Sequence, residues 1–491
     1  MSSTQLVVIG AGPGGYAAAF AAADLGMQVT LVDPEPNPGG VCLFRGCIPS
    51  KALLHVAKVI AEAKHAPAWG ITFGEPRIDL DKLRAFKDGV VNKLTGGLGQ
   101  LSRQRKITHI QGTASFVSNT VLDIELVKGG REPLTFEHAI IATGSRPSAV
   151  PGLSIDSARL MDSTSALDLP DIPKSLLVVG GGYIGLELGS VYAALGTKVT
   201  VVEMTPGLLP GADRDLVTFL NRRLEQSLHK ILLNARVVDL KEVKAGVKVR
   251  IEGVPSTSSG QAPSTSSGRV ALSDADREQT FERVLVSVGR KPNSAIPGLD
   301  KTKVKIIERG FIEVDLARRT AEPNIFAIGD VTGEPMLAHK ASHEARVAVE
   351  TIAGHNVAFE PQAIPAVVFT DPEVAWCGLT ETEAARQGRQ VEIARFPWAA
   401  LGRAVAIDRT DGATKLVIDP ATERVLGVGL VGAGAGELIA EGVVAVEMGA
   451  RASDVALSIH PHPTLSETLM EAAEVFFGHS THVYRPRRNP H

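Results

Sequence analysis

Two cysteines, Cys42 and Cys47, stand five positions apart in the stretch GGVCLFRGCIPSKALL of a chain with three cysteines in all. In a regular helix their Cα atoms would lie roughly 8–9 Å apart, whereas a disulfide tolerates up to about 7 Å. A bond between them therefore requires a break in helical geometry, for which Gly46 gives the freedom. Pro49 favours a helix start after this break, where a thiolate is stabilised. Lys51 follows on the same helical face as Cys47, so the sequence favours an exchange-prone disulfide with one activated sulfur.

Two other interpretations of this cysteine pair stay open. A zinc site would need a second pair of ligands, and Cys377 is a single distant thiol, so we predict no metal site. The second interpretation is a pair of buried free thiols without a chemical role. Three cysteines are too few for a disulfide scaffold and fit a reducing compartment, which favours a cytoplasmic location. The first residues, MSSTQLVVIG, have neither the charged segment nor the cleavage site of a secretory signal.

A third chemical element is IHPHPTLSET, in which His462 stands between Pro461 and Pro463 and Glu467 follows five residues later. The prolines restrict the backbone around the ring. A carboxylate bonded to one ring nitrogen sets the tautomer and raises the basicity of the other nitrogen. Such a pair suits proton exchange with a thiol, whose thiolate is the reactive form. The alternative is an ordinary surface or core histidine, as we expect for most of the 13 histidines.

The chain opens on a dinucleotide-binding pattern, QLVVIGAGPGGYAAAFAAADLGMQVTLVD, which runs strand, glycine turn, helix, second strand and acid. Within it, Gly10 permits the tight turn, Gly12 lets the backbone approach a pyrophosphate, and Gly15 brings helix and strand together. The phosphates would lie at the helix N-terminus, and Asp33 would accept a hydrogen bond from a ribose hydroxyl. The alternative is a tight turn that binds no ligand.

The same pattern returns at SLLVVGGGYIGLELGSVYAALGTKVTVVE, with Gly180, Gly182 and Gly185 in the equivalent positions and Glu203 after the second strand. An acid there accepts from the 2′-hydroxyl of NAD and repels the 2′-phosphate of NADP. The next ten residues contain no arginine, so NAD is favoured. Two such units predict two dinucleotides, one resident and one that exchanges.

The remaining motifs and the composition set the layout. AIIATGSRP, VLVSVGRKPN and NIFAIGDVTGEPMLAHKA predict further nucleotide contacts, with Asp330 binding a ribityl or ribose hydroxyl. We expect an α/β fold with two Rossmann-like dinucleotide-binding domains and a C-terminal α+β domain. The predicted domains are residues 1–150 with 286–352, residues 151–285, and residues 353–491. The repeat PSTSSGQAPSTSSG at 255–268 should be a mobile hairpin tip between the strands GVKVRIEG and RVALSD.

Charge and hydropathy exclude two classes of partner. The net charge of −3 comes from interspersed residues of both signs and gives no basic surface for nucleic acid. No apolar run approaches the roughly 20 residues that span a bilayer. We therefore expect neither nucleic acid nor a membrane as a partner.

These motifs as a set, together with FTDPEVAWCGLTE and HPHPTLSE, resemble the dihydrolipoamide dehydrogenase family of flavoprotein disulfide reductases. The resemblance covers nearly the whole chain, except the PSTSSG insert and the basic tail HVYRPRRNPH. It implies FAD at the first nucleotide unit and NAD at the second. The FAD-binding residues that it implies are Gly10, Gly12, Gly15, Asp33, Gly40, Thr143, Gly144, Asp330 and Ala338. The implied NAD-binding residues are Gly180, Gly182, Gly185, Glu203 and Gly289.

The resemblance also implies roles for the side chains near the cysteines. Cys42 is the sulfur that exchanges with substrate, and Cys47 is the sulfur that faces the flavin. Lys51 would pair with Glu187 beside the flavin ring. The implied reaction is the oxidation of dihydrolipoamide to lipoamide with reduction of NAD⁺.

For the C-terminal motif, the resemblance implies a homodimer with an active site shared between chains. His462 and Glu467 become the acid–base pair acting on the disulfide of the partner chain, and the His462–Pro463 peptide is expected to be cis. The implied partners are lipoamide or a lipoyl-bearing protein, in a 2-oxoacid dehydrogenase or glycine cleavage complex.

Two departures from the family pattern concern Asp33, in place of the usual glutamate, and the pair Phe44 and Arg45, in place of an asparagine-containing version. We expect Phe44 and Arg45 near the substrate mouth, where Arg45 would favour an acidic carrier. A glutathione-type reductase would want arginines after the second fingerprint, and a mercuric reductase a cysteine pair after Cys377. A reductase of another disulfide that uses NADH, or a non-catalytic docking subunit, remains an alternative; a docking subunit would need neither the cysteine pair nor His462.

Overall fold

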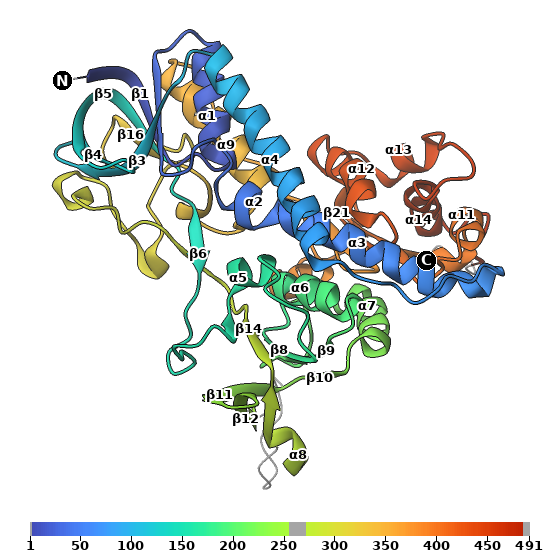
Figure 1. The fold of residues 1–491 in the computed structure, drawn as a ribbon. Coiled ribbons are helices and arrows are strands. Elements are labelled where there is room, and N and C mark those ends of the chain that lie inside the picture. The colour runs from blue at the N-terminus through green and yellow to red at the C-terminus, as the bar shows by residue number, and fades with distance from the viewer. Residues whose placement is uncertain (1, 255–271, 485–491) are drawn as a thin grey trace, which may run out of the picture.

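The computed structural model describes residues 2–254 and 272–484, which form a mixed α/β structure with three large sheets (Figure 1). Two of the sheets contain a parallel strand–helix–strand unit, and the third is antiparallel and lies near the C-terminus. The predicted fold class is therefore confirmed.

The first sheet is built around the N-terminal fingerprint. Strand β1 pairs in parallel with β2 and β5, and the sheet extends through β3 next to β2 and β16 next to β5, while β4 runs antiparallel between β3 and β5. Residues 6–9 of β1 are all buried, as expected for a central parallel strand. The strands are β1 (Ser2–Ile9), β2 (Val29–Asp33), β3 (Thr108–Phe116), β4 (Val121–Leu126), β5 (Arg131–Ile141) and β16 (Ile325–Ala327).

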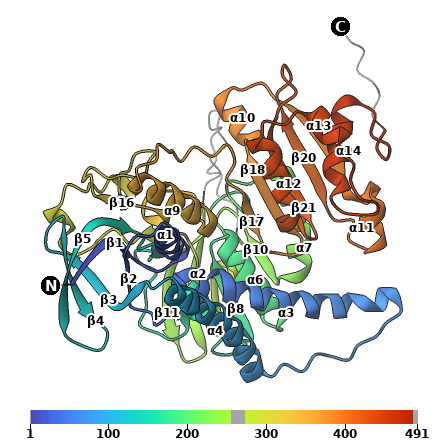
Figure 2. The same cartoon turned by 90° about the horizontal axis from the view of Figure 1, so that it is seen from above.

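Helices α1 (Pro13–Asp24) and α9 (Ala338–Ile352) lie side by side against this sheet (Figures 1 and 2). Their backbones approach closely because α1 is rich in alanine, and Ala18, Ala19 and Ala22 are buried at 0% exposure. Helix α4 (Leu80–Gln104) begins at Asp79, whose side chain accepts from the Lys82 backbone N–H and so caps the first turn.

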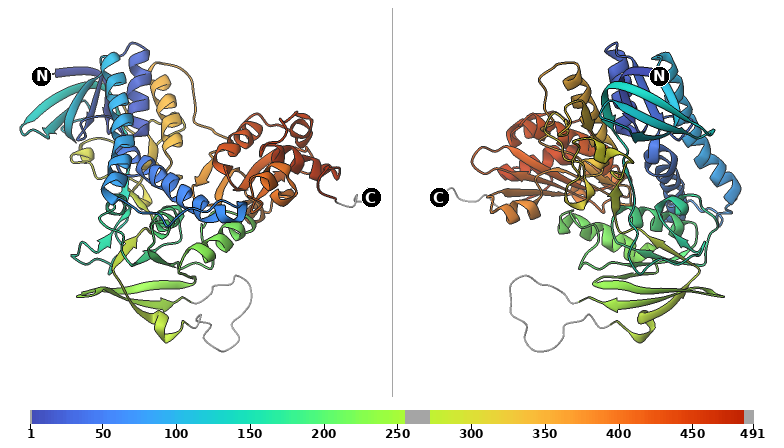
Figure 3. Two further views of the ribbon diagram at one scale, coloured as in Figure 1. Left: turned by 45° about the vertical axis from the view of Figure 1, so that its right-hand side comes forward. Right: turned by 90° about the vertical axis from the view of Figure 1, so that its left-hand side faces the viewer.

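The second sheet repeats the arrangement around the second fingerprint. All of its pairings are parallel, in the order β10-β9-β8-β14-β7. Beside it lies a small antiparallel sheet, β11-β12-β13, which Figure 3 shows at the end of the molecule opposite the first sheet. The strands are β7 (Leu160–Met161), β8 (Ser175–Val179), β9 (Lys198–Val202), β10 (Lys230–Leu232), β11 (Ala235–Val243), β12 (Gly246–Gly253), β13 (Glu278–Phe281) and β14 (Arg283–Val286).

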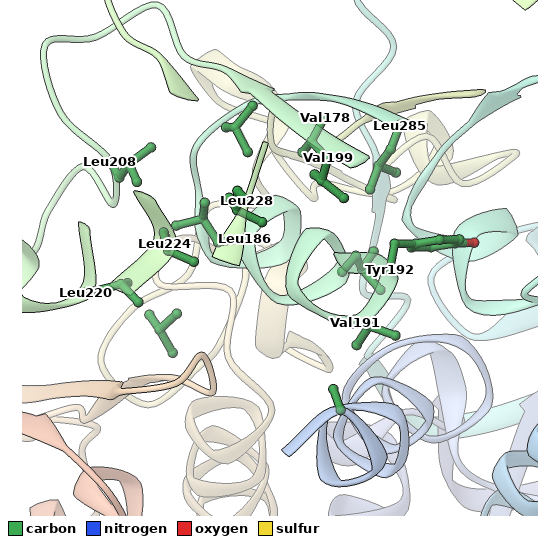
Figure 4. Packing of buried hydrophobic residues seen from close by; sticks show 14 of the residues in the cluster. Val178, Leu186, Val191, Tyr192, Val199, Leu208, Leu220, Leu224, Leu228 and Leu285 are labelled. Atoms are coloured by element: carbon green, nitrogen blue, oxygen red, sulfur yellow. The ribbon is translucent and has the colours of Figure 1, made fainter. Parts of the chain in front are cut away.

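Helix α6 (Tyr183–Ala194) fills the core of this unit (Figure 4). Its Leu186 and Val191 belong to the same buried cluster as Val178 and Val199 on the sheet. Each large side chain buried in this way contributes about 1.5–3 kcal/mol. Tyr192 is buried as well, and its hydroxyl donates to the carbonyl of Ala166 at 2.9 Å, so the ring's polar end is satisfied. Helix α5 (Ser163–Leu167), which carries Ala166, is thereby fixed against α6.

The C-terminal sheet is antiparallel, in the order β17-β18-β21-β20-β19. Helices α12 and α14 pack against it (Figure 2), and the segments TKLVIDP and VLGVGLVG contain its strands β20 and β21. The elements are β17 (Ala366–Val368), β18 (Glu373–Gly378), α10 (Glu381–Gln387), β19 (Glu392–Pro397), α11 (Gly402–Ala406), β20 (Ala413–Ile418), β21 (Val425–Gly432), α12 (Ala435–Glu447), α13 (Ala452–Leu457) and α14 (Glu467–Phe477).

A buried ion cluster joins this domain to α7 (Arg214–Ser227) of the second unit. Lys415 on β20 is 1% exposed, and its ammonium donates to Asp213 at 2.6 Å, to Asp215 at 2.7 Å and to Glu381 at 3.3 Å. The three carboxylates are close enough together to hold a cation, and the lysine supplies that charge.

Helix α3 (Cys47–His65) spans two domains (Figures 1 and 2). It follows α2 (Gly40–Arg45), packs on α6, and ends beside the C-terminal domain, where the His65 ring is 2.8 Å from Asp408. Trp69, just past its end, donates to the same carboxylate at 3.0 Å.

The 255–268 insert and the tail from residue 485 lie outside the described residues. The strand predicted at RVALSD is wrong in its described part: residues 272 and 273 are not in a strand, and Asp274 begins helix α8 (Asp274–Arg277). The partner of β12 is instead β13. The domain boundaries at 150, 285 and 352 stay a prediction. Among the described residues, no helix combines the length and apolar character that crossing a bilayer requires.

Candidate active site

The two glycine turns have the tight geometry that the fingerprint predicts. A Cβ on Gly15 would lie 1.8 Å from the carbonyl oxygen of Gly10, and one on Gly185 would lie 2.4 Å from that of Gly180. Both first glycines have positive φ angles, +98° and +108°. Glycine is therefore required at these four positions by the close contact of helix and strand.

The acid after each unit is held in the same way. Asp33 accepts from the backbone N–H of Ala11 at 2.7 Å and of Glu35 at 2.9 Å. Burial raises the pKa of Asp33, and the hydrogen bond from Ala11 opposes this. A carboxylate fixed by backbone donors keeps lone pairs free, with which it can accept from a ribose hydroxyl.

Glu203 repeats this arrangement in the second unit. It accepts from the N–H of Gly181 at 2.6 Å and of Thr205 at 2.8 Å. The two donors occupy the same relative positions as in the first unit: the residue after the first glycine, and the residue two after the acid. The two units are thus matched in hydrogen bonding as well as in pattern.

A cavity of about 530 Å³ runs from the first glycine turn to the cysteine pair. Where α2 meets the turn, a Cβ on Gly40 would lie 2.4 Å from the Cα of Gly12, so the backbones line the cavity directly. This cradle fits an elongated dinucleotide, whose phosphates require close backbone approach. The predicted residues that line it are Gly10, Gly12, Asp33, Gly40, Cys42, Cys47, Lys51, Thr143, Gly144, Glu187, Asp330 and Ala338. Of the predicted FAD-binding residues Gly15 lies behind the lining, and the predicted NAD-binding residues and the pair His462 and Glu467 lie outside it.

The cysteines occupy the junction of two helices. Helix α2 ends at Arg45, Gly46 takes a non-helical conformation, and α3 begins at Cys47, so the break expected at Gly46 is present. Both cysteines are thiols in this structure. The hydrogen bond between them and the positive charge of Lys51 lower the pKa of Cys47 to about 7, against the opposing effect of desolvation, and the same hydrogen bond raises the pKa of Cys42. Cys47 is therefore the thiolate of the pair and Cys42 its proton donor.

Lys51 and Glu187 meet as predicted, at 2.8 Å, across the contact between α3 and α6. The other oxygen of Glu187 accepts from the backbone N–H of Phe369 at 3.0 Å. The Lys51 ammonium also lies 4.5 Å from the centroid of the Phe369 ring. Glu187 and Phe369, which are distant from each other in the sequence, thus fix the lysine one turn from Cys47.

The Asp330 end of the cavity contains residues that the sequence analysis did not single out. Ser145 donates to Asp330 at 2.5 Å and accepts from Arg290 at 2.7 Å. Their segments pair as the short strands β6 (Ser145–Pro147) and β15 (Arg290–Pro292). Ser145 and Arg290 each follow a glycine in the motifs ATGSRP and SVGRKP quoted above. The pattern Gly-x-basic-Pro that these motifs share could have indicated the two residues. Buried Glu344 accepts from the backbone N–H of Gly329 at 2.6 Å and supports the same turn.

Arg45 has a partner that the sequence did not indicate. Its guanidinium forms an ion pair with Glu35, two residues after β2, and its charge acts on Asp33. It lines the same cavity as the cysteines, beside the acid of the first nucleotide unit.

The predicted His462–Glu467 pair is formed, with 2.9 Å between the His462 Nδ1 and the carboxylate. Burial opposes ionisation of Glu467, but hydrogen bonds from the Thr464 backbone and from His462 lower its pKa. The His462 side chain is 72% exposed, and the His462–Pro463 peptide is cis as expected. Within one chain, α14 lies apart from α2 (Figures 1 and 2), and neither His462 nor Glu467 lines the cavity that contains the cysteines.

Comparison with known proteins agrees with this geometry. Residues 4–345 match the pyridine nucleotide-disulphide oxidoreductase family, and residues 364–473 match its dimerisation domain. Dihydrolipoyl dehydrogenase from Haemophilus influenzae is 48% identical over 97% of this chain and 96% of its own length. The enzyme of that name from Vibrio cholerae is 46% identical over 96% of each.

Among solved structures, LpdA from Mycobacterium tuberculosis superimposes with a TM-score of 0.86 at 25% identity, covering 96% of this chain and 99% of its own. The resemblance inferred from the sequence is therefore confirmed. The family uses FAD and NAD(H), and the glycine cradle fits such dinucleotides. On its own geometry and on these matches, the chain belongs to the pyridine nucleotide-disulphide oxidoreductases, among which its close relatives are dihydrolipoyl dehydrogenases.

Proposed function

We propose that this protein oxidises dihydrolipoyl groups to the lipoyl disulfide and reduces NAD⁺ to NADH. Two relatives that are 46–48% identical to this chain over nearly their whole length are named dihydrolipoyl dehydrogenase. The single observation that best supports the chemistry is the asymmetry of the cysteine pair, in which Cys47 has a pKa of about 7 beside Lys51. A disulfide breaks fastest when the sulfur that leaves has the lower pKa.

In the proposed reaction, one dihydrolipoyl thiol gives its proton to His462, whose ring Glu467 orients, and the resulting thiolate attacks Cys42 of a Cys42–Cys47 disulfide. Cys47 leaves as a thiolate, held by the positive charge of Lys51. The second dihydrolipoyl thiol then displaces Cys42. The lipoyl group gains a disulfide and loses two hydrogens, and the enzyme disulfide becomes two thiols.

Bound FAD would carry the two electrons from the thiols to NAD⁺. We assign its site to the cavity, with Asp33 and Asp330 accepting from ribose and ribityl hydroxyls. We assign NAD to the second unit, where the fixed carboxylate of Glu203 suits the 2′-hydroxyl. The remaining proposed contacts are Gly10, Gly12, Gly40, Thr143, Gly144 and Ala338 for FAD and Gly180, Gly182 and Gly289 for NAD. Gly15 and Gly185 support these sites by bringing helix and strand together.

The partners and the place of the reaction are also proposals. The match to a dimerisation domain, and the position of His462 outside the cavity that contains the cysteines of its own chain, support a homodimer in which the His462–Glu467 pair serves its partner's cysteines. We propose lipoamide or a lipoyl-bearing protein of a 2-oxoacid dehydrogenase or glycine cleavage complex as substrate. The low cysteine content supports a cytoplasmic location.

The test is to purify the protein, record its flavin absorption, and follow NADH formation with dihydrolipoamide. The matched variant is Cys42→Ser, which keeps the size of the side chain and removes the exchanging sulfur. We expect a yellow wild-type protein that reduces NAD⁺ and a yellow variant without turnover. A colourless protein, or turnover that survives Cys42→Ser, contradicts the proposal. Flavin without turnover on dihydrolipoamide favours a reductase of another disulfide, or a docking subunit.

A further inference from the structure

Arg45 lies at the nucleotide part of the cavity, on the last turn of α2. Its guanidinium is ion-paired with Glu35. Burial raises the pKa of Asp33, and the charge of Arg45 is one of the effects that oppose this. The charged groups that shift the pKa of Cys47 are instead Lys51 and Glu187. Arg45 therefore acts on the nucleotide acids and lies away from the charges that control the thiols.

Each of the cations that line the cavity has a partner, and Arg45 is the one that lies beside the acid of the first nucleotide unit. Among the described residues, the lining cations are Arg45, Lys51 and Arg290. Lys51 is bound by Glu187 at 2.8 Å, and Arg290 makes two hydrogen bonds to Ser145, at 2.7 and 2.8 Å. A dinucleotide brings a doubly negative diphosphate into a region where two carboxylates already face one guanidinium.

The glycine backbone supplies no full positive charge of its own. The turn at Gly12 and Gly40 offers N–H dipoles, whereas Asp33 and Glu35 add full negative charges. A guanidinium binds phosphate oxygens in a bidentate manner and keeps its charge at every working pH. The side chains of Arg45 and Glu35 are 41% and 24% exposed, so Arg45 can turn toward a phosphate without disturbing a buried core.

We propose that Arg45 is a binding residue for the FAD diphosphate, that Glu35 holds it in place, and that the pair sets how firmly the protein retains its flavin. This deepens the proposed function and rests on its assignment of FAD to the cavity. It replaces the prediction that Arg45 selects an acidic lipoyl carrier.

The test measures flavin retention without turnover. Holoenzyme is diluted serially, and the fluorescence of released FAD gives the dissociation constant for the wild type, Arg45→Met and Arg45→Lys. We expect Arg45→Met to weaken retention about tenfold, which corresponds to about 1.4 kcal/mol. Arg45→Lys keeps the charge and should restore most of the affinity. The difference between wild type and Arg45→Met should shrink as salt increases, because screening weakens the contact.

The matched control is Arg105→Met, which removes an arginine paired with Asp24 at 2.9 Å outside the cavity lining. It should retain FAD as the wild type does. Glu35→Gln combined with Arg45→Met should bind FAD more firmly than Arg45→Met alone, because the unbalanced carboxylate is gone. Equal retention by wild type and Arg45→Met overturns this inference but leaves the proposed function standing.

A second outcome separates the two roles considered for Arg45. If Arg45→Met retains FAD but changes the ratio of rates with lipoamide and lipoate, carrier selection is correct and flavin retention is wrong. A wild-type protein that binds no FAD overturns both this inference and the proposed function.

Discussion

Cys42 and Cys47 are identical thiols that their surroundings make different. The hydrogen bond between them places the proton on Cys42, and Lys51 stabilises the charge on Cys47. Glu187 holds Lys51 in place, although its own charge works against the thiolate. The chemistry of the pair therefore depends on a lysine side chain positioned by another domain.

Replacing Lys51 tests this dependence directly. In the reduced protein, we expect Cys47 to titrate near pH 7 in the wild type and about one pH unit higher in Lys51→Met, because the stabilising charge is lost. The measurement is the pH dependence of Cys47 alkylation, read by mass spectrometry. Lys64→Met, on the last turn of the same helix, is the control and should leave the profile unchanged. Identical profiles for Lys51→Met and wild type would show that the lysine has no such role.

Residue identities at the site were predictable where one residue type is chemically required. The cysteine pair, the fingerprint glycines and the His462–Glu467 pair could be found in the sequence for that reason. The ion pair of Arg45 was not predicted because its partner Glu35 lies ten positions away, and only the fold shows that they meet. Ser145 was not singled out because its role depends on an aspartate that is distant in sequence.

The fingerprint turns show how elements depend on single glycines for two different reasons. A Cβ at Gly185 would lie 2.4 Å from a backbone oxygen, whereas one at Gly182 would meet nothing within 4 Å. Gly185 is required by the packing of α6 on β8, and Gly182 leaves room for a ligand that approaches the turn.

Alanine at these two positions should therefore separate folding from binding. Gly185→Ala should lower stability by about 2 kcal/mol through overpacking, and it should weaken NAD binding as well. Gly182→Ala should keep the wild-type melting temperature and raise the KM for NAD⁺ about tenfold. Thermal denaturation and steady-state kinetics measure the two effects. A large loss of stability in Gly182→Ala would contradict this distinction.

Element boundaries were predictable from local pattern, and their partners less so. The strand–helix–strand units appear where apolar runs and glycines predict them. The strand expected after the insert was wrong because a short run further on, EQTF, pairs with β12 in its place. Strand pairing of this kind is decided by neighbours that are distant in sequence.

At the scale of the molecule, Lys415 links the C-terminal sheet to the second nucleotide unit. Removing it would leave Asp213, 5% exposed, without its counter-ion. We expect Lys415→Met to reduce stability by about 3 kcal/mol. Arg395→Met is the control: that arginine contacts Asp215 at 2.8 Å but is 40% exposed, so its loss should cost below about 1 kcal/mol. Denaturant unfolding followed by circular dichroism compares the two.

The same cluster gives an acid response of defined sign. Burial opposes ionisation of Asp213, but hydrogen bonds from Lys415 and Thr382 lower its pKa to about 2, below the ordinary 3.8. Its stabilising contribution is complete above about pH 4 and is lost as pH falls through about 2. The Lys415→Met protein should therefore lose less stability than the wild type over that interval, and an equal loss would rule out the cluster as the cause.

The separation of His462 from the cysteines in one chain has a genetic consequence for the proposed dimer. Cys42→Ser and His462→Gln should each be inactive alone, yet subunit exchange between them should revive catalysis. In each mixed dimer, one active site contains both substitutions and the other contains neither. Since an equal mixture yields about half mixed dimers, it should recover about a quarter of normal turnover. Two broken copies of this gene would then complement each other within one cell.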